Sequence, residues 1–130
     1  MEDQINIAVD AMGGENSPRK VIKGIEIHNS NSKNIFYNIF GDQKLLDPLL
    51  NDSSLPNNSY RVIHSINSIR DTDSPLSAAK KGKDTSMWLS VQSLKNDESH
   101  AIVSAGNTGA LFVIAKLNLN MIENIDKPAL

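Results

Sequence analysis

The chain has 130 residues, a length that suits one ordinary domain with a buried core. Its 13 basic and 15 acidic residues leave a formal net charge of −2, which argues against a general nucleic-acid binder. The lack of cysteine excludes disulfides, thiolate metal sites and a cysteine nucleophile. Neither a secretory leader pattern nor an apolar run of roughly 20 residues is evident, so we expect a soluble cytoplasmic protein.

Four short apolar runs have the length and composition of buried strands: residues 5–10, 35–40, 60–64 and 101–104. Helical patterns separate these runs. Alternating strands and helices predict an α/β fold, here a three-layer α/β/α sandwich with a mostly parallel sheet. The length of the chain suits one domain of this kind. Ligands of such sheets bind beyond the carboxyl ends of the strands.

Helix-start signals occur at five places: Ser17-Pro18, Asp42, Ser74-Pro75, Asp84 or Thr85, and Asn107 or Thr108. The first helix should end near His28-Asn29, and Pro48 should limit the second to one or two turns on each side. Gly82 is placed to end the third helix. The last helix, ending near Asn118, is apolar around much of its circumference, so we expect it to be largely buried. Residues 65–73 are polar and mixed, and are expected to line a cleft.

A glycine-rich loop at residues 104–109 lies between a buried strand and an apolar helix. Free N–H groups and the helix dipole favour an anion at such a helix start. Gly106 and Gly109 would let the backbone turn tightly and let a ligand approach without meeting a Cβ atom. A tight strand–helix turn explains the same glycines. The residues alone leave the phosphate site and the packing turn equally supported.

A second such loop follows Asp10 and contains Gly13 and Gly14. Asp10 either positions a substrate or, more simply, caps its own loop through side-chain to backbone bonds. A basic cluster further along the chain consists of Lys80, Lys81 and Lys83. These lysines could bind phosphate or an acidic partner, although a run of charges is more often a solvated helix face.

Three other positions carry weaker hints. His64 ends a strand near the expected cleft and is a candidate general base. Ser86 adds a hydroxyl near a helix start, where it is more simply part of the cap. The three histidines share no metal-ligand spacing, so we expect no metal site.

Four stretches in order resemble the bacterial phosphate acyltransferases of phospholipid synthesis, the acyl-carrier-protein:phosphate acyltransferases. They are Val9–Glu15 with Pro18, the block from Ile63 to Met87, Val103–Leu111, and Ile125–Leu130. Members of that family are similar in fold to isocitrate dehydrogenases and phosphotransacetylases. The resemblance implies transfer of a fatty acyl group from acyl carrier protein to inorganic phosphate, giving acyl phosphate. It also implies a homodimer, loose membrane association in some members, and no cofactor.

The resemblance also implies a site in which phosphate attacks the thioester directly, so that positioning and oxyanion stabilisation carry catalysis. Its catalytic candidates are Asn107, Lys83 and His64. Its candidates for binding phosphate or substrate are Asp10, Gly13, Gly14, Lys80, Lys81, Ser86, Ser104, Gly106, Thr108 and Gly109. Asn107 would either help hold phosphate through its backbone or donate to the developing oxyanion.

Family members are considerably longer, so the resemblance implies that residues 1–130 form the N-terminal part of a single α/β/α catalytic domain. Two other interpretations stay open. One is a catalytically inactive fragment that at most binds phosphate or a partner. The other is a phosphotransacetylase-like enzyme acting on a coenzyme A thioester.

Overall fold

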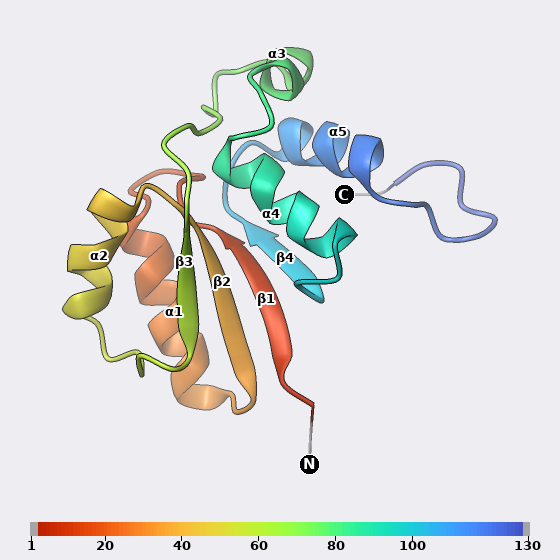
Figure 1. The fold of residues 1–130 in the computed structure, drawn as a ribbon. Coiled ribbons are helices and arrows are strands. Elements are labelled where there is room, and N and C mark those ends of the chain that lie inside the picture. Colours follow the sequence, from red (N-terminus) through yellow and green to blue (C-terminus); the bar gives the residue numbers. More distant parts are fainter. Residues whose placement is uncertain (1–2, 129–130) are drawn as a thin grey trace.

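The computed structural model describes residues 3–128, and at its centre lies a sheet of four parallel strands (Figure 1). The strands are β1 (Ile5–Asp10), β2 (Ile35–Gly41), β3 (Tyr60–His64) and β4 (Ala101–Ser104). Their order in the sheet is β3-β2-β1-β4, so β3 and β4 are the edge strands. All four predicted strands are confirmed to within one residue. In the register between β1 and β4, Asp10 lies opposite Ser104.

Helices cover both faces of this sheet. The helices are α1 (Arg19–Asn31), α2 (Gln43–Asn51), α3 (Pro75–Lys80), α4 (Ser86–Lys95) and α5 (Thr108–Asn118). Figure 1 shows α1 and α2 on one face, α4 and α5 on the other, and α3 beyond the carboxyl ends of the strands. The predicted three-layer α/β/α arrangement is therefore confirmed.

Each face has its own hydrophobic core, because side chains of a strand alternate between the two faces. One core joins α1 and α2 to the sheet through Val9, Ala11, Ile22, Ile25, Tyr37, Ile39, Leu46, Leu50 and Leu55. The other joins α3, α4 and α5 to β4, with buried residues Ile69, Ala78, Met87, Trp88, Val91, Ala110 and Ile114.

Four of the five expected caps form as predicted. The side chains of Asp42, Ser74, Thr85 and Asn107 each accept a hydrogen bond from a backbone N–H of the first helical turn. The prediction for α1 was wrong, because the Ser17 hydroxyl donates instead to the Gly13 carbonyl at 2.5 Å, and Pro18 takes the cap position. Gly82 follows Lys81, the C-cap residue of α3, and has φ +118°, as expected for a residue that ends a helix.

Two helices differ from expectation in extent or burial. Helix α1 continues to Asn31, two to three residues beyond the end predicted at His28-Asn29. Helix α5 is not largely buried: Ala110 and Ile114 are its buried residues, and the Leu117 side chain is 64% exposed. The reason is that α4 and α3 cover only part of its apolar circumference. No helix in residues 3–128 combines the length and the apolarity needed to cross a bilayer.

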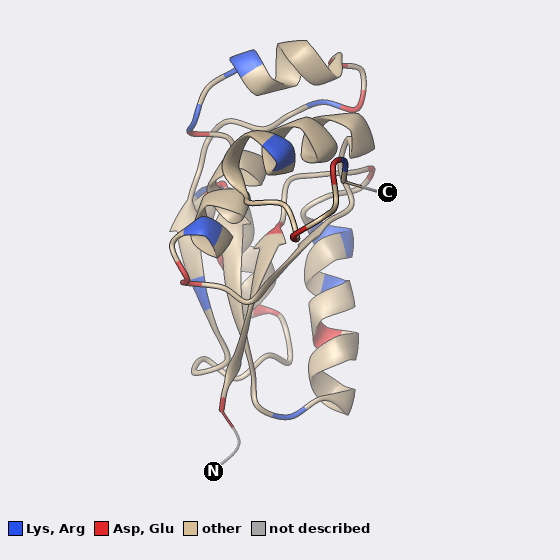
Figure 2. Cartoon of the chain, turned by 90° about the vertical axis from the view of Figure 1, so that its right-hand side faces the viewer, with Lys and Arg blue, Asp and Glu red and all other residues tan. Residues whose placement is uncertain are grey.

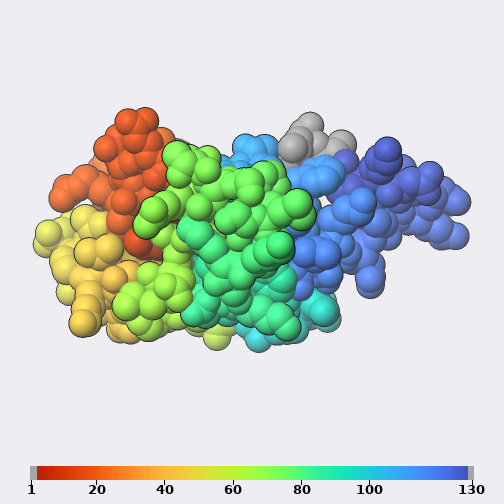
Figure 3. Space-filling view, turned by 90° about the horizontal axis from the view of Figure 1, so that it is seen from above, coloured from red at the N-terminus to blue at the C-terminus, as the bar shows by residue number. Residues whose placement is uncertain are grey.

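The segment at residues 65–85 crosses the carboxyl edge of the sheet. In Figure 3, which looks onto this edge, it lies between the loop that follows β1 and helix α5. The start of this segment is fixed by the buried Ser65 hydroxyl, which donates hydrogen bonds to the carbonyl oxygens of Asn67 at 3.0 Å and Asp84 at 2.6 Å. A short parallel bridge joins Asn67 to Thr85.

Candidate functional site

The two glycine-rich loops pack against each other, backbone to backbone, at the carboxyl ends of β1 and β4. A Cβ atom on Gly13 would lie 2.9 Å from both the Cα and the N of Gly106. Gly14 has φ +92°, and a Cβ there would lie 2.5 Å from the Ala105 carbonyl oxygen. These glycines are therefore required for the contact between the loops, which supports the packing interpretation of their role.

The Asp10 side chain is the centre of this contact. It is 2% exposed, and its two oxygens accept hydrogen bonds from Ser86 Oγ at 2.6 Å and from Ser104 Oγ at 2.8 Å. The Met12 N–H adds a third, longer bond of 3.3 Å. Asp10 thus joins the end of β1, the start of α4 and the end of β4. Its buried carboxyl group holds the loops in place and does not face solvent.

The side chain of Asn107 holds a second junction. Its Oδ1 accepts from the Ala110 N–H at 3.0 Å, while its Nδ2 donates to the carbonyl of Asp73 at 2.7 Å and that of Arg70 at 3.2 Å. The side chain therefore caps α5 and ties residues 70–73 to it. With the amide group used in this way, the geometry favours a positioning role for Asn107 over direct donation to a substrate.

The first turn of α5 contains backbone N–H groups that have no acceptor within the helix. Asn107 Oδ1 and the Asn107 carbonyl accept from Ala110 and Leu111. The preceding N–H groups, those of Thr108 and Gly109, belong to the part of a helix that has no intrahelical acceptor. Helix α3 packs directly over this turn, since a Cβ on Gly109 would lie 2.7 Å from Pro75 Cγ. These two N–H groups are the donors that a helix start of this kind offers to an anion.

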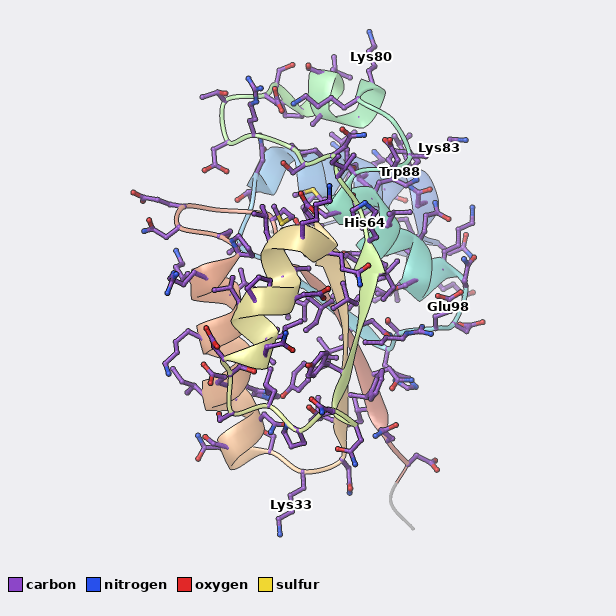
Figure 4. The ribbon with its side chains drawn as sticks, turned by 60° about the vertical axis from the view of Figure 1, so that its left-hand side comes forward. Lys33, His64, Lys80, Lys83, Trp88 and Glu98 are labelled. Carbon is purple, nitrogen blue, oxygen red and sulfur yellow. The ribbon has the colours of Figure 1, made fainter. Side chains whose placement is uncertain are left out.

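Of the three lysines, Lys81 is the one connected to this junction. Its ammonium forms an ion pair with the Asp73 carboxylate, whose backbone carbonyl accepts from Asn107. The hydrogen bond from Lys81, and then that from the Arg70 N–H, hold the pKa of Asp73 below its usual value. Lys80 and Lys83 are exposed and point outward (Figure 4). Basic residues are visible at the end of α3 and just after it in Figure 2.

His64 lies away from the junction. It ends β3, and two strands separate β3 from β4, a distance of roughly 14 Å at the usual strand spacing. Its Nδ1 accepts from the Gln43 N–H at 3.2 Å, at the start of α2. Figure 4 shows His64 near the upper end of β3. The structure therefore does not bring this candidate base to the glycine-rich loops.

A polar cavity of about 380 Å³ lies beside the junction, between the segment at 65–70 and the start of α4. Its lining residues are Ile66, Asn67, Ser68, Arg70, Lys81 and Thr85. Two of these are cationic, so the cavity suits an anionic group. Sequence reasoning expected a cleft here but missed Arg70, because residues 65–73 have neither helical nor strand periodicity. The isolated basic residue Arg70 near the lysine cluster was the available signal.

The structure sorts the predicted site residues into groups. Those that form one packed unit around Asp10 are Gly13, Gly14, Ser86, Ser104 and Gly106. Thr108 and Gly109 adjoin this unit through Asn107, and Lys81 is linked to Asn107 through Asp73. Lys80, Lys83 and His64 stand apart. Among residues 3–128, no cluster of three or more His, Asp or Glu side chains could hold a metal ion.

A parallel sheet covered by helices on both faces, with loops gathered at its carboxyl edge, places the chain among the open-sheet α/β proteins. A family model described as "Fatty acid synthesis protein" matches residues 5–130, and the chain belongs to this family. It is 56% identical over its whole length to a phosphate acyltransferase of Pelagibacter ubique, of which it covers 38%.

Other relatives carry the same name. The phosphate acyltransferase of Rhodospirillum rubrum is 33% identical over the whole chain, which covers 37% of it. That of Parvibaculum lavamentivorans is 39% identical over 97% of the chain, which covers 35% of it. These relatives are enzymes by name. The chain matches the N-terminal part of such relatives and spans little more than a third of their length.

Proposed function

We propose that the chain forms the phosphate-binding, N-terminal part of an enzyme that transfers a fatty acyl group from acyl carrier protein to inorganic phosphate. The observation that carries the proposal is the junction of the two glycine-rich loops at the carboxyl edge of the sheet. Two facts support the proposal. Ligands of open parallel sheets bind beyond the carboxyl ends of the strands, and the relatives share the name phosphate acyltransferase. The product would be an acyl phosphate for phospholipid synthesis.

The proposed step is an acyl transfer without a covalent enzyme intermediate. A phosphate oxygen attacks the thioester carbonyl carbon, a C–O bond forms, and the C–S bond breaks. The electron pair of that bond leaves with sulfur, and the proton given up by phosphate ends on the thiol. Such a reaction needs positioning of the two substrates and stabilisation of the oxyanion, which N–H groups and cations supply.

We assign the residues as follows. The N–H groups of Thr108 and Gly109 bind phosphate, and the cations nearest to them in the network are Lys81 and Arg70. Asp10 and Asn107 position the loops. Lys80 and Lys83 do not line the polar cavity beside the junction, so we assign them to attracting phosphate or an acidic carrier protein and not to holding a bound anion. His64 keeps no role in this arrangement.

A second candidate is that residues 1–130 bind phosphate but do not turn over. The 38% coverage of the Pelagibacter ubique relative favours it, because an acyl-binding surface can lie in the unmatched part. The homodimer and the loose membrane association implied by the family resemblance are proposals for the longer protein.

The test is an assay of thiol release from acyl carrier protein thioester with and without phosphate. The proposal expects phosphate-dependent release by this chain joined to the part of the Pelagibacter ubique enzyme that follows the matched segment. Release by the joined protein but not by residues 1–130 alone would select the second candidate. Faster release from a coenzyme A thioester would instead indicate a phosphotransacetylase-like enzyme.

Within that assay, Lys83→Ala tests whether Lys83, a catalytic candidate from the sequence, takes part in binding phosphate. If Lys83 binds phosphate, the substitution raises the phosphate concentration needed for half-maximal release. An unchanged phosphate dependence removes Lys83 from the site. Arg70→Ala is the matched comparison, since the Arg70 side chain lines the polar cavity. We expect the larger effect at Arg70.

A further inference from the structure

The outer edge of β4 is open among the described residues. The His100 N–H donates to the Asn6 carbonyl of β1 at 2.8 Å, so the N–H groups of residues 102 and 104 also face β1. By the same alternation, the backbone groups of Ala101 and Val103 face away from β1. The sheet order places no strand on that side in residues 3–128. An unpaired edge of this kind is a template for another strand.

An apolar groove lies beside this edge, on the face of the sheet that carries α1. The cavity has a volume of about 470 Å³, and its apolar walls include Ile7, Val9, Val21, Ile25, Tyr37 and Val103. Val103 is 57% exposed although it lies in the middle of a strand. A patch of this kind, continuous with an open strand edge, is typical of a surface that other polypeptide covers.

The handedness of the crossovers says where the next strand would lie. The crossover β1–α1–β2 moves toward β3 with its helix on one face, and β3–α4–β4 moves the opposite way with its helix on the other face. Both are therefore of one hand, as expected for parallel sheets. Helix α5 packs on the α4 face. A crossover of the same hand through α5 leads to the outer edge of β4.

We propose that the open edge of β4 and the adjoining groove receive a parallel strand, with its apolar side chains, from the polypeptide that follows the matched segment in the relatives. The matched relatives have such polypeptide, because the chain covers only their N-terminal part. A second copy of this chain is a poorer occupant, since a two-fold axis at a sheet edge pairs identical strands antiparallel. This inference concerns the completion of the sheet and does not rest on the proposed function.

Hydrogen exchange at single amides tests it. The chain alone is compared with the chain joined after residue 130 to the part of the Pelagibacter ubique enzyme that follows the matched segment. In the joined protein, exchange of the Ala101 and Val103 amides should slow by at least about tenfold, whereas Ile102 is protected in both. Equal exchange of Ala101 and Val103 in the two proteins would overturn the proposal. So would protection in the chain alone that rises with its concentration.

A second measurement separates a docking surface from a simple effect of fusion. Val103→Lys and Leu45→Lys, a position on α2 that is similarly exposed at 50%, are each placed in the joined protein. Val103→Lys should remove the slowing of exchange at the Ala101 amide, and Leu45→Lys should leave that slowing intact. Equal effects of the two substitutions would contradict the proposal.

Discussion

Asp10 and Ser86 lie 76 residues apart in the sequence and are joined by a buried hydrogen bond of 2.6 Å. Because Ser104 bonds the other oxygen of the same carboxyl group, one side chain connects β1, α4 and β4 where the glycine-rich loops meet. The geometry of the candidate site therefore depends on a buried side chain.

The first prediction concerns this connection. Asp10→Asn replaces one acceptor oxygen by an NH₂ group, which leaves a buried hydroxyl without its acceptor. The free energy of unfolding should fall by about 1–3 kcal/mol, measured by urea denaturation. Asp47→Asn, at an exposed position on α2, is the control and should change it by less than about 0.5 kcal/mol. Equal effects of the two substitutions would contradict the connecting role of Asp10.

Gly13 offers a test of the contact between the loops. Gly13→Ala places a Cβ 2.9 Å from the backbone of Gly106 and should separate the loops, with a loss of about 1–3 kcal/mol in the free energy of unfolding. Gly24→Ala is the matched control, because nothing lies within 4 Å of its Cβ position in α1. There, the higher helix propensity of alanine should raise stability by about 0.5–1 kcal/mol. In thermal unfolding, Gly13→Ala should therefore lower the stability and Gly24→Ala should raise it.

The two roles of Asn107 can be separated by substitution. Asn107→Ser keeps an N-cap for α5 but loses the donor to the carbonyls of residues 70–73. Asn107→Ala loses both and should cost about 1 kcal/mol more, the usual value of a cap. Both variants should speed exchange of the Arg70 amide, which donates to Asp73 Oδ2. Unchanged exchange at Arg70 in both variants would mean that Asn107 does not hold this loop.

The ion pair between Asp73 and Lys81 predicts a dependence on pH. The pKa of Asp73 is lowered in the folded chain, first by the hydrogen bond from Lys81. The folded state therefore binds its proton less readily than the unfolded state, so the stabilisation is present above the usual aspartate pKa. It is lost as the pH falls through the lowered value. In urea denaturation between pH 6 and pH 2.5, Asp73→Asn should lose less stability on acidification than the unsubstituted chain. An identical pH profile would contradict this.

Most of the fold was readable from the sequence, and the reasons are local. Strand lengths, the Asp42, Ser74, Thr85 and Asn107 caps, and Gly82 after α3 all depend on neighbouring residues. The Ser17 cap failed because the hydroxyl found a carbonyl four residues earlier. Sequence patterns carry no information about such competition between acceptors.

The place of the two glycine-rich loops was predicted, but their contacts were not. The carboxyl edge and both loops follow from strand–helix alternation, yet the partners of Asp10 and Asn107 depend on tertiary packing. The expected burial of α5 failed for a different reason. Helix α5 is apolar around much of its circumference, but the rest of the described chain covers only part of it. Leu117 is 64% exposed as a result.

The central claim, that phosphate binds at the start of α5, is tested most directly by titrating the ¹⁵N-labelled chain with inorganic phosphate and following its amide resonances. The account predicts that the largest shifts are those of Thr108 and Gly109 and that they saturate, while sodium chloride at equal ionic strength does not reproduce them. Shifts confined to Lys80 and Lys83, or equal shifts with chloride, would contradict it.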